Sequence, residues 1–154
     1  MGQKLARSLN VDFIDLDQRI TESIGMEIAT IFKEKGEDHF RQVERDVLLA
    51  LPYEGIHVVA LGGGSPCSED NWDFIQRTGM SIYIKVPEDV LFGRLREQKE
   101  KRPLTADRTD EALRSYINKT LSDREEFYNR AEFIYEKDKT SWSFLINQID
   151  LYIK

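Results

Sequence analysis

Phe13-Ile14-Asp15-Leu16-Asp17 is the stretch that decides how this chain is interpreted, because two carboxylates alternate there with apolar residues. The stretch ends a short hydrophobic run, residues 11–16, which predicts a buried strand. Side chains of a strand alternate between its two faces, so we expect Asp15 and Asp17 to point to the same side. Paired acids at the carboxyl end of a parallel strand suit a magnesium ion and a substrate hydroxyl.

The composition is that of an ordinary globular protein. The chain has 154 residues, 40% hydrophobic and 32% charged, which is enough for one domain with a buried core. No apolar run is as long as a membrane span, and the N-terminus lacks a signal-peptide pattern. The single cysteine, Cys67, favours a reducing compartment, and the net charge of -6 argues against a nucleic-acid partner. We therefore predict one cytoplasmic domain, residues 1–154, with no membrane or nucleic-acid partner.

Short apolar runs alternate with helical patterns along the rest of the chain. Further strands are predicted at residues 56–61, 82–86 and 133–135. The helical patterns lie at residues 5–9, 20–32 with an interruption at Gly25, 40–51, 72–75, 87–99, 111–130 and 142–149. Asn10 is predicted to end the first of these helices, and Gly36 to stop the segment that follows Gly25. This alternation predicts an α/β fold of three layers, a parallel sheet with helices on both faces. The polar segment of residues 101–112 is predicted to form a lid.

Two motifs place polar groups beside turns or on one helix face. Gly62-Gly63-Gly64 follows the second predicted strand, where glycine lets the backbone turn and lets a ligand approach its N–H groups. Arg41 and Glu44 are three residues apart on a helix, so the glutamate can hold the arginine against a ligand carboxylate. The ordinary alternatives are a tight turn and a solvated surface ion pair. Taken alone, each motif favours its ordinary alternative.

Two further arginines lie beside other signals. Arg102, in Arg102-Pro103-Leu104, opens the predicted lid and can swing over a phosphate. Arg124 shares a helix face with Tyr128, four residues later. The ordinary alternatives are a solvated loop charge and a surface arginine lying over an aromatic ring. The order of all these motifs along the chain carries more information than any one of them.

In that order and spacing, the chain resembles the shikimate kinase family over essentially its whole length. The matching residues are Phe13-Ile14-Asp15-Leu16-Asp17, Ile31-Phe32, Gly36-Glu37, Phe40-Arg41, Glu44, Gly62-Gly63-Gly64, Asn71 and Arg102-Pro103-Leu104. The resemblance implies a fold like that of the P-loop nucleoside monophosphate kinases. It also implies transfer of the ATP γ-phosphate to the 3-hydroxyl of shikimate with Mg²⁺, a step of chorismate and aromatic amino-acid biosynthesis, by a protein that is usually monomeric.

The resemblance implies a substrate-binding region of about residues 18–45 and gives substrate-binding roles to further residues outside it. It implies that Asp17 holds the shikimate hydroxyls and takes the proton of the attacking one. Arg41 and Arg124 would grip the shikimate carboxylate. Gly62, Gly63 and Gly64 would line the pocket with backbone N–H groups.

The resemblance also assigns residues to the nucleotide. Asp15 would reach Mg²⁺ through water, and Arg102 would close over the phosphates of ATP with the lid. Arg94 resembles the arginine on the adenine side, although its spacing to Arg102 is one residue longer than the family's usual spacing.

The phosphate-binding motif Gly-x-x-x-x-Gly-Lys-[Ser/Thr] does not occur in the sequence. Residues 1–6 resemble the family helix that begins just after it, so the first strand and the loop, about 12–16 residues, are expected to be missing. A misassigned start codon, a shortened chain and a natural pseudokinase are the three explanations, and we favour the first two because the other catalytic positions are present. We expect little kinase activity from the chain as given. Exposed sheet edges are expected to lower its stability or to permit an oligomer.

Two alternative functions remain open at this point. A non-catalytic shikimate-binding pseudokinase would explain the missing phosphate loop directly. A related small-molecule kinase, such as a gluconate kinase, would share the phosphoryl-transfer chemistry. Arg41 and Arg124 together with Asp17 favour shikimate, because they suit a cyclic triol that carries a carboxylate.

Overall fold

The chain divides into two units, each of which contains one pair of parallel strands. The computed structural model describes residues 1–52, 54–97 and 108–153. Unit 1 comprises Met1–Met80 and Ser141–Lys154, and unit 2 comprises Ser81–Thr140. That residues 1–154 act as one domain stays a prediction.

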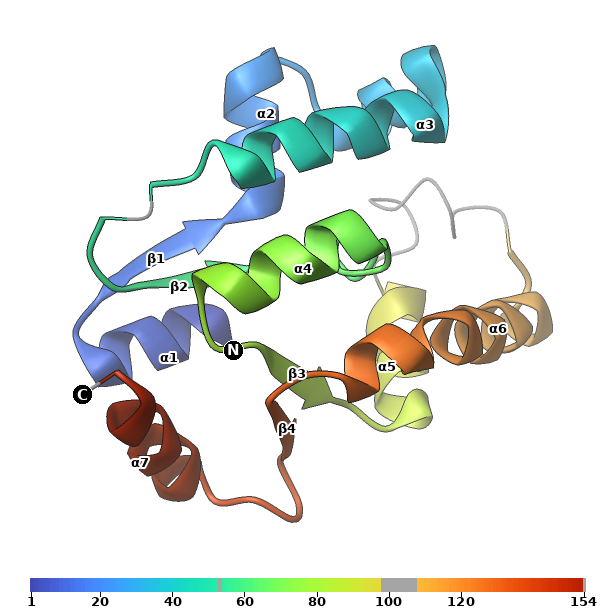
Figure 1. The fold of residues 1–154 in the computed structure, drawn as a ribbon. Helices are drawn as coiled ribbons and strands as arrows, with labels where there is room; N and C mark the ends of the chain where they lie inside the picture. The colour runs from blue at the N-terminus through green and yellow to red at the C-terminus, as the bar shows by residue number, and fades with distance from the viewer. Residues whose placement is uncertain (53, 98–107, 154) are drawn as a thin grey trace. The chain divides into compact units, whose positions relative to one another are not determined.

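Unit 1 combines one pair of parallel strands with helices. Its elements are α1 (Gly2–Leu9), β1 (Asp12–Asp15), α2 (Leu16–Ile24), α3 (Ile28–Leu49), β2 (His57–Ala60), α4 (Glu69–Thr78) and α7 (Trp142–Tyr152) (Figure 1). Strand β1 pairs with β2 in parallel, with Asp12 opposite His57 and Asp15 opposite Ala60. Because parallel strands end at the same edge, Asp15 and the glycines that follow β2 lie at one edge of this sheet.

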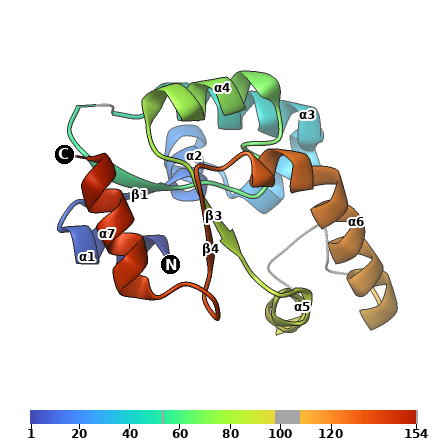
Figure 2. The same cartoon turned by 60° about the horizontal axis from the view of Figure 1, so that its bottom comes forward.

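Unit 2 repeats the parallel pairing with two helices. Its elements are β3 (Ile82–Lys85), α5 (Glu88–Glu97), α6 (Asp110–Asn129) and β4 (Phe133–Glu136). Strands β3 and β4 lie side by side and run parallel (Figure 2). Phe92 of α5 packs against Leu113 and Ile117 of α6, and all three side chains are buried. The two parallel pairs agree with the predicted α/β class.

The first strand is shorter than predicted, and this corrects the geometry expected for its acids. Strand β1 ends at Asp15, and α2 begins at Leu16. The Asp15 carboxylate caps that helix, because its Oδ1 accepts hydrogen bonds from the backbone N–H groups of Asp17 (3.1 Å) and Gln18 (3.3 Å). Asp17 therefore lies in the first turn of a helix, and the expectation that both acids share one face of a strand is wrong.

The predicted helix breaks are confirmed. Asn10 ends α1 in the left-handed conformation, at φ 54°, and Gly25 ends α2 at φ 67°. Gly36, at φ 84°, makes a kink inside α3. Glycine and asparagine tolerate positive φ better than other residues, which explains why the chain turns at these three positions.

One hydrophobic cluster of unit 1 is formed by β1, the start of α2, both parts of α3 and the segment just after α3. Its buried members are Ile14, Leu16, Ile20, Ile31, Phe40, Val43, Leu48 and Leu51. The rings of Phe32 and Phe40, on either side of the Gly36 kink, pack with centroids 4.5 Å apart. This packing holds the second part of α3, which carries the arginine described below.

The other helix boundaries lie close to those predicted. Helix α6 begins at Asp110, capped by the Thr109 hydroxyl, so residues 110–112 of the predicted lid are helical. Residues 101–107 of that lid lie outside the described residues. No helix in the described part of the chain combines the length and the apolar character that crossing a bilayer requires.

Candidate functional site

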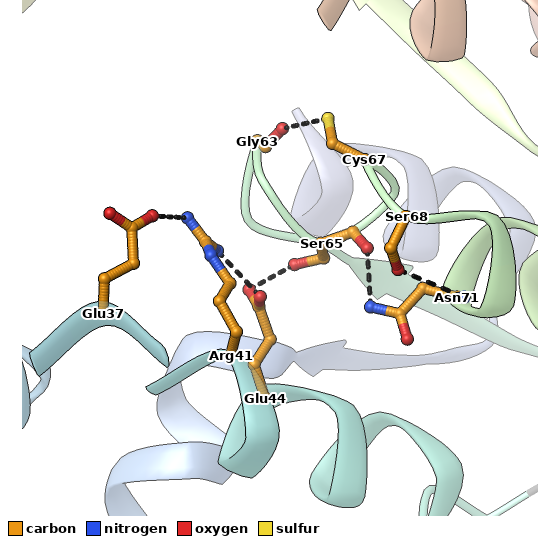
Figure 3. Close-up of polar contacts among 8 residues, drawn as sticks. All are labelled: Glu37, Arg41, Glu44, Gly63, Ser65, Cys67, Ser68 and Asn71. Atoms are coloured by element: carbon orange, nitrogen blue, oxygen red, sulfur yellow. Dashed lines mark hydrogen bonds and ion pairs between the residues drawn. The ribbon is translucent and has the colours of Figure 1, made fainter. Parts of the chain in front are cut away.

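Arg41 is held in place by two carboxylates of its own helix. Its Nη1 lies 2.8 Å from Glu44 Oε2, and its Nη2 lies 3.0 Å from Glu37 Oε1 (Figure 3). The Glu44 side chain is 2% exposed and the Glu37 side chain 56% exposed. Burial lowers the pKa of Arg41, but the hydrogen bonds and charges of Glu44 and Glu37 raise that pKa above its ordinary value. Arg41 is therefore a fixed, charged guanidinium with one-third of its side chain open to a ligand.

Glu44 also binds the loop that follows β2. The Ser65 hydroxyl donates to Glu44 Oε1 at 2.5 Å, and Ser65 is fully buried. The backbone oxygen of Ser65 accepts a hydrogen bond from Asn71 Nδ2 of α4 at 2.8 Å (Figure 3). The buried carboxylate thus joins α3 to the loop and, through that loop, to α4.

A side chain would collide with a charged group at Gly64 and would be tightly packed against charged groups at Gly62. A Cβ atom added at Gly64 would lie 2.5 Å from Arg41 Nη1, well inside normal contact. One added at Gly62 would lie 3.4 Å from Asp17 Oδ1 and 3.3 Å from Glu44 Oε1. The missing side chains therefore let the loop approach the acid and the arginine closely. Asp17, Arg41, Gly62 and Gly64 come together at the loop after β2.

Asp15, predicted to reach Mg²⁺ through water, uses one carboxylate oxygen to cap α2. Within residues 1–52, 54–97 and 108–153, no cluster of three or more His, Cys, Asp or Glu side chains is arranged to hold a metal ion. Mg²⁺ in proteins commonly keeps several waters and binds one or two carboxylates together with substrate phosphates. A single carboxylate beside the site therefore fits Mg²⁺ that arrives with a nucleotide.

The remaining predicted residues lie elsewhere. Arg124 is half-buried in α6, and Arg94 is exposed in α5; both belong to unit 2. Their action together with Arg41 of unit 1 stays a prediction. Arg102 lies outside the described residues. The ring of Tyr128, which shares a helix face with Arg124, stacks on Tyr83 with centroids 4.9 Å apart.

Sequence reasoning assigned no role to two members of the site. Glu37 lies four residues before Arg41 on the same helix face, a spacing that could have identified it as a second partner. Ser65 follows the glycines directly, but its contact with Glu44 spans 21 residues of sequence, and no local pattern indicates it.

Comparison with known proteins gives a consistent result. The family model described as shikimate kinase matches residues 1–151. A curated shikimate kinase of Bacteroides thetaiotaomicron is 40% identical over 140 residues, which cover 90% of this chain and 79% of that protein. A curated shikimate kinase of Flavobacterium johnsoniae is 36% identical over 134 residues, covering 86% of this chain and 78% of that protein.

Solved structures agree with the sequence comparison. The crystal structure of shikimate kinase from Bacteroides thetaiotaomicron matches with a TM-score of 0.83 at 36% identity, covering 99% of this chain and 89% of that one. Shikimate kinase from Acinetobacter baumannii in complex with shikimate matches with a TM-score of 0.83 at 27% identity, covering 99% of this chain and 83% of that one. Fold, motif order and identity point the same way, and the chain belongs to the shikimate kinase family.

Proposed function

We propose that this chain binds shikimate at the loop after β2 and is built for transfer of the γ-phosphate of ATP to the shikimate 3-hydroxyl. The observation that carries the proposal is the meeting of Asp17 and Arg41 at Gly62 and Gly64. An anionic polyol needs a cation for its carboxylate and an acceptor for its hydroxyls, and this site supplies both. The two groups belong to different helices of one unit, so their spacing is set by the packing of α2 against α3.

Arg41 is suited to bind the carboxylate. Glu44 and Glu37 fix its guanidinium from two sides, which lowers the entropy that a ligand would otherwise lose by ordering it. An arginine has five N–H donors, so donors remain after these two contacts. Binding at the carboxylate orients the ring, and orientation is the main protein contribution to phosphoryl transfer.

Asp17 is suited to the hydroxyl that reacts. It accepts the proton of that hydroxyl while the hydroxyl oxygen forms a bond to the γ-phosphorus and the bond from that phosphorus to the ADP oxygen breaks. Asp15 would help to hold Mg²⁺ through water, and that ion would supply positive charge against the phosphates. Arg102 and Arg94 complete the proposal on the nucleotide side, and Arg124 is proposed as a second carboxylate ligand.

Isothermal titration of the full chain with shikimate tests the binding site. We expect wild type to bind, and Arg41→Met to bind about 10–100-fold more weakly, because one charge-assisted contact contributes about 1.5–3 kcal/mol. Arg45→Met is the matched control: Arg45 lies on the same helix but pairs with Asp70 of α4. Absence of binding by wild type, or equal affinity in Arg41→Met, would refute the proposed site.

Phosphoryl transfer is tested separately, by ADP release with shikimate as acceptor. Where turnover is measurable, Asp17→Asn should lower it by about 100-fold or more, the usual contribution of a positioned base. Shikimate affinity should fall much less, because an asparagine still accepts hydrogen bonds. Gluconate as the acceptor distinguishes the related kinase: preferential turnover of gluconate would contradict the substrate assignment.

A further inference from the structure

Ser65 and Arg41 both form a hydrogen bond with the side chain of Glu44. The two oxygens of Glu44 are divided between different partners: Oε2 accepts from Arg41 Nη1 at 2.8 Å, and Oε1 accepts from the Ser65 hydroxyl at 2.5 Å (Figure 3). As whole residues, Glu44 and Ser65 are 1% and 0% exposed, so water does not compete for the hydrogen bond between them. The serine hydroxyl therefore decides which way a buried carboxylate faces the arginine.

Ser65 itself is fixed from two directions. Its backbone N–H donates to the Gly62 oxygen at 3.1 Å, and its own backbone oxygen accepts from Asn71 Nδ2 at 2.8 Å. Asn71 is 7% exposed and lies in the first turn of α4. A hydroxyl whose backbone is held by both the glycine loop and a helix has little freedom to follow a moving partner.

We propose that Ser65 is a positioning residue for the substrate carboxylate, acting through Glu44 on Arg41. This inference rests on the proposed function and assigns that site a residue which does not itself touch substrate. With Ser65 in place, Glu44 takes a single N–H of the arginine. Without the hydroxyl, the buried Oε1 atom of Glu44 loses its hydrogen-bond donor. We expect the carboxylate to rotate until both of its oxygens accept hydrogen bonds from the Arg41 guanidinium. The donors that a substrate carboxylate needs are then occupied.

The positioning role of Ser65 can be separated from a general effect on folding, because it affects only the binding of the shikimate carboxylate. Isothermal titration compares shikimate with its methyl ester, which keeps the ring and hydroxyls but has no charge for Arg41 to bind. We expect Ser65→Ala to bind shikimate about tenfold more weakly, equivalent to about 1.4 kcal/mol. Its affinity for the methyl ester should stay within about twofold of wild type, because the effects of changes at independent sites usually agree to within about that factor.

Ser68→Ala provides the matched control. It removes a hydroxyl three residues along the same segment, where the Ser68 Oγ caps α4 by accepting from the Asn71 backbone N–H. This variant should lower stability while leaving the ratio of the two ligand affinities unchanged. Ser65→Cys supplies a second test variant of nearly native size, since a thiol is a weak donor, and should show the same selective loss.

The outcomes are distinct. A loss confined to shikimate in both Ser65 variants supports the inference. Wild-type affinity for shikimate in those variants overturns it, and so does an equal loss for acid and ester, which would indicate general loosening of the pocket. Failure of the wild-type chain to bind shikimate refutes the proposed function instead, and this result cannot be confused with the other two.

Discussion

The two carboxylates on Arg41 differ in burial, and this difference allows a quantitative test of how the site is stabilised. Glu44→Gln and Glu37→Gln make the same chemical change on the same guanidinium, but the side chains are 2% and 56% exposed. A glutamine at position 44 can keep both hydrogen bonds, with its oxygen toward Arg41 and its amide toward Ser65. What it loses is the charge.

The expected magnitudes follow from that difference. A hydrogen bond to a charged group contributes about 1.5–3 kcal/mol and a neutral one about 0.5–1.5, so Glu44→Gln should lower the free energy of unfolding by about 1.5 kcal/mol. The Glu37 pair is open to water, and its loss should cost less than about 0.5 kcal/mol. The first variant should therefore be at least about three times as destabilising as the second.

Urea unfolding followed by tryptophan fluorescence measures both variants. The two tryptophans, Trp72 and Trp142, belong to unit 1, so their emission reports on the unit that contains the site. With a urea dependence of about 2 kcal/mol per molar, the transition midpoint should fall by about 0.75 M for Glu44→Gln and by less than about 0.25 M for Glu37→Gln. Equal shifts would refute the reasoning, because burial would then have no effect on the strength of the pair.

Three other changes have defined outcomes. Gly64→Ala should displace the Arg41 guanidinium and weaken shikimate binding about tenfold in calorimetry, because the new Cβ would lie 2.5 Å from Nη1; unchanged affinity would contradict the close approach. Asn10→Ala should lower the free energy of unfolding of unit 1 by about 1 kcal/mol in the urea assay, with Asn10→Gly as the control that relieves the positive φ. Burial, and then the charge of Tyr128, raise the pKa of Tyr83 above 10.0. The folded state therefore holds that proton more tightly, and stability is retained below pH 10.0 and lost as the pH rises further. Absorbance titration should find one tyrosine that ionises late and is absent in Tyr83→Phe, and its persistence in that variant would disprove the assignment.

Local signals were sufficient for most of the secondary structure. Asn10, Gly25 and Gly36 stop or kink helices where the sequence indicates, because positive φ is a property of the single residue. The error at Asp15 came from following strand periodicity when a second local signal was present. An aspartate followed three residues later by glutamine, Gln18, is a helix-start pattern, and here the cap outweighs the alternation.

The contacts of the site also divide into those that local spacing predicts and those that it does not. The pairing of Arg41 with Glu44 could be predicted because both lie on one helix, three residues apart. The approach of Gly62 to Asp17 could be expected only from the family resemblance, since the two residues are 45 positions apart and all of α3 and β2 lies between them in the sequence. The contact of Ser65 with Glu44 could be predicted neither from local spacing nor from the family resemblance.

The sequence by itself determined the α/β class, the positions of the helix breaks and the membership of the shikimate kinase family, because these depend on residue type, local spacing and motif order. Only the tertiary structure decided how closely Asp17, in the first turn of α2, approaches Gly62, and that a buried glutamate links Arg41 to Ser65. The physical reason is range. Caps and turns are made by neighbours in sequence, whereas the Ser65 contact exists only because α3 packs against the loop after β2 and excludes water from Glu44.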